Sequence, residues 1–153
     1  MSAAVLVFVE ASLLLHCVDD VDLGKRDRAR QWMTVLWTRR CGRLSVPVLQ
    51  DFYNSARERF PSALSAGDAR AEVRRYQHWT PWSIDHATLE TAWAVESRFD
   101  LAWRDALTVA AAQQQGCRYL LCEHLPHGQQ IDGVQILNPF AVGPDLLDAP
   151  TPP

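Results

Sequence analysis

"VLVFVEASLLL", residues 5–15, is an apolar run that a single acid, Glu10, interrupts. Its first five residues are rich in valine and phenylalanine and do not alternate with polar residues, which is typical of a strand buried on both faces of a parallel sheet. Such a strand has no room for a charge along its length. A carboxylate just past its end emerges at the carboxyl edge of the sheet, where α/β proteins bind ligands. The stretch therefore predicts a covered, mostly parallel sheet with Glu10 at its ligand-binding edge.

Helical and extended patterns alternate along the rest of the chain. Apolar residues at helical spacing and capping residues predict helices at 12–18, 21–40, 68–79 and 101–116, with two more beginning at Pro47 and after Asp85. The predicted strands that follow the first one cover 44–46, 81–84, 117–122 and 134–137. Strands separated by helices favour an α/β fold whose mostly parallel sheet is covered on both faces.

The length and composition indicate one packed domain. The chain has 153 residues, 48 % of them hydrophobic, and six tryptophans, which excludes disordered and collagen-like classes. We expect Trp32, Trp37 and Trp93 to lie in the core, because bulky aromatic residues at helical spacing usually face inward. The domain is expected at residues 1–140, with a loose proline-rich tail at 141–153.

The N-terminal apolar run is not typical of a signal peptide, because no Lys or Arg precedes it and an acid divides it. No apolar stretch of about 20 residues, as a membrane-spanning helix needs, is present. The four cysteines form no CxxC pair and have no zinc-finger spacing, so we expect small buried side chains in a reducing compartment. These features predict a cytoplasmic protein without membrane contact.

Charge is distributed unevenly along the chain. The formal net charge is −3, yet residues 24–75 hold twelve Lys or Arg against five acids. A solvated helical face explains most individual arginines. A basic rim beside an acidic pocket is the alternative, and it would suit a ligand with a phosphate backbone.

Four acidic or metal-binding positions are predicted at one edge of the sheet. Glu10 follows the first strand, Asp51 and Asp105 lie early in helices, and Glu123 and His124 follow a later strand. Strand ends and the starts of the following helices share an edge in a parallel sheet, so these side chains can converge. Clustered carboxylates repel one another unless a cation lies among them, and oxygen ligands suit Mg²⁺ or Mn²⁺. Such an ion activates water against a phosphodiester without a nucleophilic side chain.

Each of these residues also has a structural explanation. An acid at a strand end or in the first turn of a helix interacts favourably with free N–H groups, which applies to Glu10 and Asp51. His124 alone is typical of a hydrogen-bonded structural histidine. Asp105 is the hardest to explain in this way, because its helical neighbours Ala102 and Val109 are small or apolar.

Four stretches together resemble a known family: "VFVEASLLL", "LSVPVLQDFY", "FDLAWRDALTVAAA" and "GCRYLLCEHLPHGQQIDGVQILNPF". They resemble the PIN domain of VapC-type toxin ribonucleases, from about Val5 to Phe140. The resemblance implies a three-layer α/β/α sandwich with a mostly parallel central sheet and a metal site of clustered acids that takes Mg²⁺ or Mn²⁺. It also implies endoribonuclease activity, a homodimer and a cognate antitoxin protein.

The resemblance assigns roles to individual residues. The first aspartate of the family falls on Glu10, its glutamate on Asp51, its third acid on Asp105 and its fourth on His124, with Glu123 adjacent as a further metal ligand. The catalytic set is thus Glu10, Asp51 and Asp105, and only Asp105 keeps the residue type of the family. An imidazole at the fourth position favours Mn²⁺ over Mg²⁺.

Further residues complete the predicted site. Ser12 stands where the family has a small polar residue, and we expect it to support Glu10 by a hydrogen bond. The candidates for RNA binding in the basic segment are Arg26, Arg57 and Arg74.

These residues have three interpretations. The first is a metal-dependent ribonuclease of the toxin type. The second is a PIN-like binding module whose acidic cleft captures a partner, such as an arginine of an antitoxin. The third, a receiver domain, needs a lysine at the active edge, and the single lysine, Lys25, is at a helix start.

Overall fold

The computed structural model describes residues 4–62 and 64–149. Its centre is a five-stranded sheet with the order β2-β1-β3-β5-β4, in which β4 alone runs antiparallel to its neighbour. The strands are β1 (Val7–Val9), β2 (Gly42–Arg43), β3 (Tyr119–Leu121), β4 (Gln130–Ile131) and β5 (Val134–Leu137).

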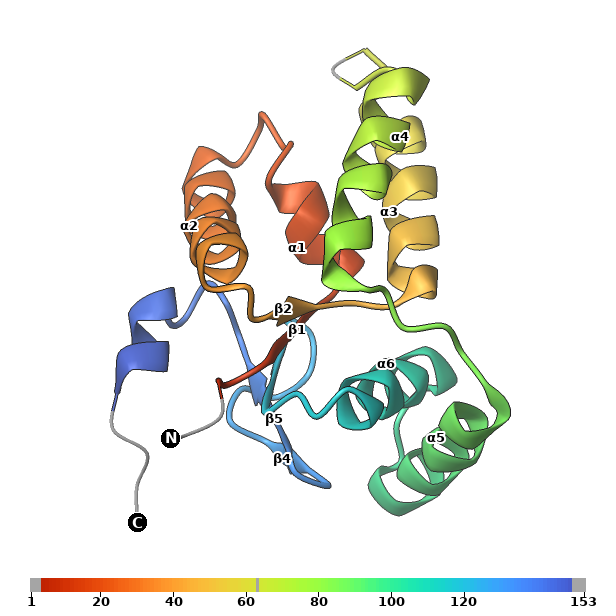
Figure 1. Ribbon diagram of the computed structural model, residues 1–153. Coiled ribbons are helices and arrows are strands. Elements are labelled where there is room, and N and C mark those ends of the chain that lie inside the picture. Colours follow the sequence, from red (N-terminus) through yellow and green to blue (C-terminus); the bar gives the residue numbers. More distant parts are fainter. Residues whose placement is uncertain (1–3, 63, 150–153) are drawn as a thin grey trace.

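Helices lie on both sides of this sheet. In Figure 1, α2 lies on one side and α6 on the other, while α1, α3 and α4 extend beyond the end of β1, which confirms the predicted α/β fold with flanking helices. The helices are α1 (Ala11–His16), α2 (Leu23–Arg39), α3 (Val46–Arg59), α4 (Ala66–Arg75), α5 (His86–Phe99) and α6 (Trp103–Gln114), with short 3-10 helices η1 (Tyr76–Trp79) and η2 (Pro144–Asp148).

The first strand is buried as its sequence predicts. Val7, Phe8 and Val9 are fully shielded from solvent, because β1 pairs with β2 on one side and β3 on the other and helices cover both faces. Trp32 of α2 is also in the core, and its indole N–H donates to the carbonyls of Pro139 and Val142. The pairing of β1 with β2 and β3 fixes this strand, and with it the position of Glu10 at its carboxyl end.

Two predicted strands are absent from the described residues. Residues 44–46 do not form a strand, because the Ser45 hydroxyl accepts a hydrogen bond from the Val48 N–H and caps α3. The strand lies two residues earlier, at Gly42–Arg43, where a side chain at Gly42 would overlap the Trp79 ring. Residues 81–84 contribute only an isolated bridge between Trp82 and Ser45.

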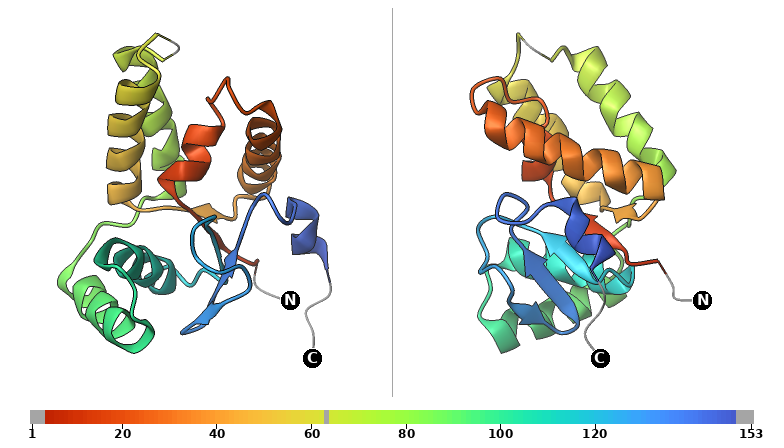
Figure 2. Two further views of the ribbon diagram at one scale, coloured as in Figure 1. Left: turned by 180° about the vertical axis from the view of Figure 1, so that it is seen from behind. Right: turned by 90° about the vertical axis from the view of Figure 1, so that its left-hand side faces the viewer.

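A further expectation was wrong. Trp93 is 44 % exposed, because the buried stripe of α5 runs through Thr88, Ala92 and Val95 and Trp93 lies one position beyond it. Part of the expected tail, Pro144–Asp148, forms η2 beside α2, with an Arg39–Asp148 ion pair of 2.9 Å. Figure 2 shows η2 below α2 and on the opposite side of the molecule from α5. Residues 150–153 of that tail lie outside the described residues.

All four cysteines are free thiols, and three are buried: Cys41, Cys117 and Cys122. Within residues 4–62 and 64–149, no helix is long and apolar enough to cross a membrane. The division between a domain at 1–140 and a tail stays a prediction.

Candidate functional site

A pocket of about 160 Å³ lies at the carboxyl end of β1. Four elements meet there: the start of α1, the second turn of α3, the first turn of α6 and the loop after β3. The polar side chains that line it are Glu10, Ser12, Asp51, Arg104, Asp105, Thr108 and His124. The structure thus brings together the four positions that the sequence places at this edge.

Asp105 and His124 form the shortest polar contact of the pocket. His124 Nε2 lies 2.6 Å from Asp105 Oδ1, and the Asp105 side chain is only 14 % exposed. Burial opposes protonation of the imidazole, but the hydrogen bond to Asp105 and the negative charge of Glu10 outweigh it and raise the pKa of His124. The contact with this acid thereby favours the protonated form of the His124 ring.

Glu10 lacks such a partner. It follows β1 directly and occupies the N-cap position of α1 without capping it through its side chain. Burial raises the pKa of its carboxyl to about 7, against the opposing effects of the nearby His124 charge and a hydrogen bond from the Cys122 thiol. No Lys, Arg or His of the described residues lies within ion-pair distance of it. Glu10 is therefore a desolvated carboxyl group near His124 but, among the described residues, without an ion-pair partner.

Asp51 faces the outer part of the pocket. Its carboxylate accepts a hydrogen bond of 3.1 Å from the Arg104 guanidinium. Both side chains are well exposed, at 44 % for Asp51 and 80 % for Arg104, so this pair is weak and mobile in water. Arg104 was not anticipated from the sequence, although it directly precedes Asp105.

Cys122 is the second group that the sequence reasoning missed. Its sulfur lies 3.3 Å from His124 Nδ1, and one donor atom each of Cys122, Glu10 and His124 lie within 4.8 Å of one another. Burial and the charge of Glu10 raise the pKa of this thiol to about 12. The available signal was the spacing of Cys122 and His124, which puts both on the same side of an extended chain.

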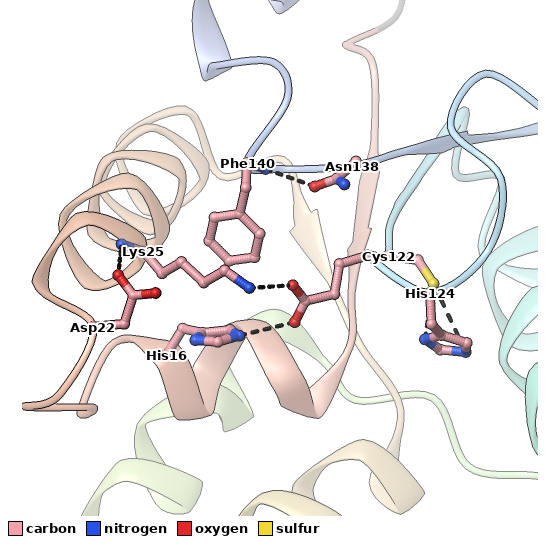
Figure 3. Close-up of polar contacts among 8 residues, drawn as sticks. His16, Asp22, Lys25, Cys122, His124, Asn138 and Phe140 are labelled. Atoms are coloured by element: carbon pink, nitrogen blue, oxygen red, sulfur yellow. Dashed lines mark hydrogen bonds and ion pairs between the residues drawn. The ribbon is translucent and has the colours of Figure 1, made fainter.

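Glu123 is not brought into the pocket. Its carboxylate accepts from His16 Nε2 and Lys25 Nζ, both at 2.9 Å. Figure 3 shows Lys25 and His16 together on one side of the strand end, with the Cys122 sulfur and the His124 ring on the other. The Lys25 ammonium also lies over the Phe140 ring, 4.9 Å from its centroid. Glu123 therefore joins α1, α2 and the end of β3.

The predicted supporting residues have mixed positions. Ser12 lines the pocket, but among the described residues its hydroxyl forms no hydrogen bond with Glu10. The three arginine candidates do not line it. Arg57 donates to the Leu64 carbonyl, and Arg26 lies 3.8 Å from Asp27. Arg74 lies in a separate groove between α3 and α4.

A second pocket, of about 220 Å³, adjoins the first. It shares Asp51 and Arg104 with it and is also lined by Trp103. Trp103 stacks on Trp93, with ring centroids 6.3 Å apart and an interplanar angle of 27°. Both rings are partly exposed, at 38 % and 44 %. An exposed aromatic pair therefore lies beside the acidic pocket.

The donor set of the pocket fits a divalent metal ion. Carboxylate oxygens and an imidazole nitrogen are common metal ligands, and an ion would supply the close positive charge that Glu10 lacks. The residues able to hold an ion from this pocket are Glu10, Asp51, Asp105 and His124. Asp51 and Asp105 would exchange or share their present contacts with Arg104 and His124.

The solved structures that are similar to this chain include the following two. One is a toxin–antitoxin complex from Klebsiella pneumoniae, with a TM-score of 0.63 and 15 % identity over 87 % of this chain and 97 % of that one. The other is the sarcin–ricin-loop-cleaving toxin VapC20 of Mycobacterium tuberculosis, with a TM-score of 0.57 and 20 % identity over 74 % of this chain and 86 % of that one. The chain shares the fold of this VapC toxin. No protein-family model and no curated protein sequence matches the chain, so the likeness concerns the fold alone.

Proposed function

We propose that this protein is a divalent-metal-dependent endoribonuclease and the toxin of a toxin–antitoxin pair. The observation that carries the proposal is the pocket that gathers Glu10, a buried carboxyl group without an ion-pair partner among the described residues, with Asp51, Asp105 and His124. This pocket lies at the carboxyl edge of the sheet in a fold shared with VapC20, a toxin that cleaves the sarcin–ricin loop. Mg²⁺ or Mn²⁺ is the expected ion.

The bound ion would activate water for attack on an RNA phosphodiester. The protein side chains have separate tasks. Glu10, Asp51 and Asp105 supply the negative charge that holds the ion, and His124 orients Asp105 through their 2.6 Å contact. Arg104, which is 80 % exposed at the rim, is placed to attract the phosphate backbone.

The exposed aromatic pair supports a single-stranded substrate. Unpaired bases stack on aromatic rings, whereas bases within a duplex are not available for such contact. Trp103 adjoins both Arg104 and the acidic pocket, so a base on its ring would bring the neighbouring phosphate toward the acids. We therefore extend the RNA-binding surface from Arg26, Arg57 and Arg74 to include Trp93, Trp103 and Arg104.

Partners follow from the same proposal. The Klebsiella pneumoniae structure is a toxin–antitoxin complex, and we propose a cognate antitoxin for this chain as well. A homodimer is likewise proposed. Both assemblies can be tested by measuring the molar mass of the purified chain alone and after co-expression with any small open reading frame found next to its gene.

The experiment that tests the nuclease proposal is cleavage of a structured RNA pool in the presence of EDTA, Mg²⁺ or Mn²⁺. A preparation of the Asp105→Asn variant, purified in the same way, controls for contaminating ribonucleases. We expect cleavage with metal, none with EDTA and none with the variant. Equal cleavage by the variant, or cleavage in EDTA, would contradict the proposal. Because a selective toxin ignores other RNAs, the pool includes ribosomal RNA fragments with exposed loops.

A second candidate is a binding module without turnover. It is favoured by the ion pairs Asp105–His124 and Asp51–Arg104, which neutralise two acids without a metal. In that case a partner arginine would occupy the position beside Glu10 as a charge-assisted hydrogen-bond donor. Partner binding that is unchanged by EDTA, together with no metal binding, would favour this candidate over the nuclease.

A further inference from the structure

We infer that the innermost metal ligands are Glu10, Cys122 and Nδ1 of His124, and that the site selects a borderline divalent ion such as Zn²⁺ or Co²⁺. This inference rests on the proposed metal-dependent function and specifies the ligands of the same site. It differs from an all-oxygen site in two ways: a thiol becomes a ligand, and Asp105 moves out of the ligand set.

The three donor atoms already lie together. One atom each of Glu10, Cys122 and His124 falls within 4.8 Å of the others. Oxygen, sulfur and nitrogen donors together are typical of sites for zinc and neighbouring transition metals, whereas Mg²⁺ prefers oxygen ligands in octahedral arrangement. Three protein ligands with one remaining position for water is also the usual composition of a catalytic zinc site.

The contacts of His124 are compatible with this set after the ring turns. Its Nε2 lies 2.6 Å from Asp105, while the Cys122 sulfur lies 3.3 Å from Nδ1 and 3.9 Å from Nε2. A metal-bound histidine commonly donates its other ring N–H to a carboxylate, which fixes the tautomer and the ring plane. From usual zinc bond lengths, sulfur and nitrogen ligands on one tetrahedral zinc lie about 3.6 Å apart. The sulfur and Nδ1 already have a separation close to this value, and a rotation of the imidazole ring would direct Nδ1 toward a shared ion.

The environment of the thiol distinguishes it from the other buried cysteines. Cys122 is 1 % exposed, yet it lies next to Glu10 and His124, and both of these line the open pocket. Within the described part of the chain, neither Cys41 nor Cys117 belongs to such a group of donors. Binding breaks the S–H bond of Cys122: the metal takes the thiolate electron pair and the proton leaves to solvent.

The test is a titration of the metal-free protein with Co²⁺, followed by optical absorption. A thiolate ligand produces a sulfur-to-cobalt charge-transfer band, and a site of oxygen ligands does not. We expect the band in the wild type and in Cys117→Ser, the matched control for loss of a buried thiol. It should be absent in Cys122→Ser and in His124→Ala. His124 is more than half exposed, so His124→Ala keeps the test valid if Cys122→Ser does not fold.

One further variant and two further ions sharpen the result. In Asp105→Asn the affinity for Co²⁺ should fall about 10–100-fold with the band retained, because this carboxylate orients the ring without touching the ion. Zn²⁺ should displace Co²⁺, and excess Mg²⁺ should not. Binding of Co²⁺ without the band, or an unchanged band in Cys122→Ser, would overturn the inference. RNA cleavage that depends on Mg²⁺ and survives in Cys122→Ser would overturn it too, while leaving the proposed nuclease function intact.

Discussion

Glu123 and His124 are neighbours in sequence, but they belong to two clusters with opposite properties. On one side of the chain, Glu123 is held by Lys25 and His16, with both contacts at 2.9 Å. On the other side, His124 faces Asp105, Glu10 and an open pocket. The Glu123 cluster is complete within the protein, because its acid has two donors. The pocket cluster contains a carboxyl group, Glu10, that has no ion-pair partner among the described residues.

The difference shows why acids at a sheet edge have to be distinguished by their partners and not only by their positions. Both clusters lie at the end of β3, and both contain a histidine close to a carboxylate. Electrostatics separates them: the pKa of Glu123 is lowered, while the pKa of Glu10 is raised to about 7. A group whose charged form is disfavoured in the folded protein is the one that benefits from an added cation.

The largest expected effect concerns Asp105. Asp105→Asn should lower RNA cleavage by at least about 100-fold, since it removes the charge that orients His124 and supports the ion. Glu123→Gln, a change in the other cluster, should leave cleavage within about twofold of wild type under the same conditions. Single-turnover rates on one RNA measure both. A similar loss in the two variants would contradict the functional separation of the clusters.

The next effect concerns the stability of the metal-free protein. The pKa of Glu10 is raised from 4.5 to about 7 by burial, so its stabilising contribution is full below pH 4.5 and is lost as the pH rises through 7. The raised pKa of His124 acts in the same direction. Glu10→Gln should therefore be more stable than wild type at pH 8, with a free energy of unfolding higher by about 2 kcal/mol. At pH 4.5 the free energies of unfolding of the two proteins should differ little. Urea unfolding at both pH values measures the difference. A variant less stable at pH 8 would indicate that Glu10 is ionised and well compensated.

A third prediction concerns the aromatic pair beside the pocket. Trp103→Ala should weaken binding of single-stranded RNA about tenfold, because base stacking on an aromatic ring contributes roughly 1–3 kcal/mol. Fluorescence polarisation in the Asp105→Asn background measures this without cleavage. Leu23→Ala, which removes an exposed apolar side chain from α2, is the control and should bind like its parent. If both changes weaken binding alike, RNA does not use the pocket side.

The smallest effect is expected in the complete cluster. Burial opposes ionisation of Glu123, but hydrogen bonds from Lys25 and His16 outweigh it and lower its pKa. Glu123→Gln should therefore reduce the free energy of unfolding by about 1 kcal/mol at pH 7. This contribution is present above pH 4.5 and is lost as the pH falls through the lowered pKa, opposite in sign to Glu10. Urea unfolding of wild type and Glu123→Gln at pH 7 and at pH 3 measures this contribution at each pH. A stability difference between the two proteins that is the same at both pH values would contradict the assignment.

The sequence predicted the sheet and the meeting of the acids for a definite reason. An unbroken apolar strand has to be covered on both faces, and parallel strands put their carboxyl ends on one edge. Glu10, Asp51, Asp105 and His124 could therefore be expected in one place, and the structure brings them to one pocket. Their roles as metal ligands stay predictions.

Three features could not be predicted from the sequence, because they depend on competition between structural elements or on contacts between distant residues. At residues 44–46, the Ser45 cap ends the strand before helix α3, and strand propensity alone does not show this. Trp93 fits a helical stripe, but α5 buries a stripe rotated by one residue against α6. The direction of Glu123 depends on Lys25, a residue 98 positions away, so no local pattern could predict it.

The most direct test of the account is a calorimetric titration of the metal-free protein with Mn²⁺, using wild type, Asp105→Asn and Glu123→Gln. The account predicts one saturable site in the wild type, an affinity reduced by about 10–100-fold in Asp105→Asn, and an unchanged affinity in Glu123→Gln. Absence of binding in the wild type at millimolar Mn²⁺, or a loss of binding in Glu123→Gln, would contradict it.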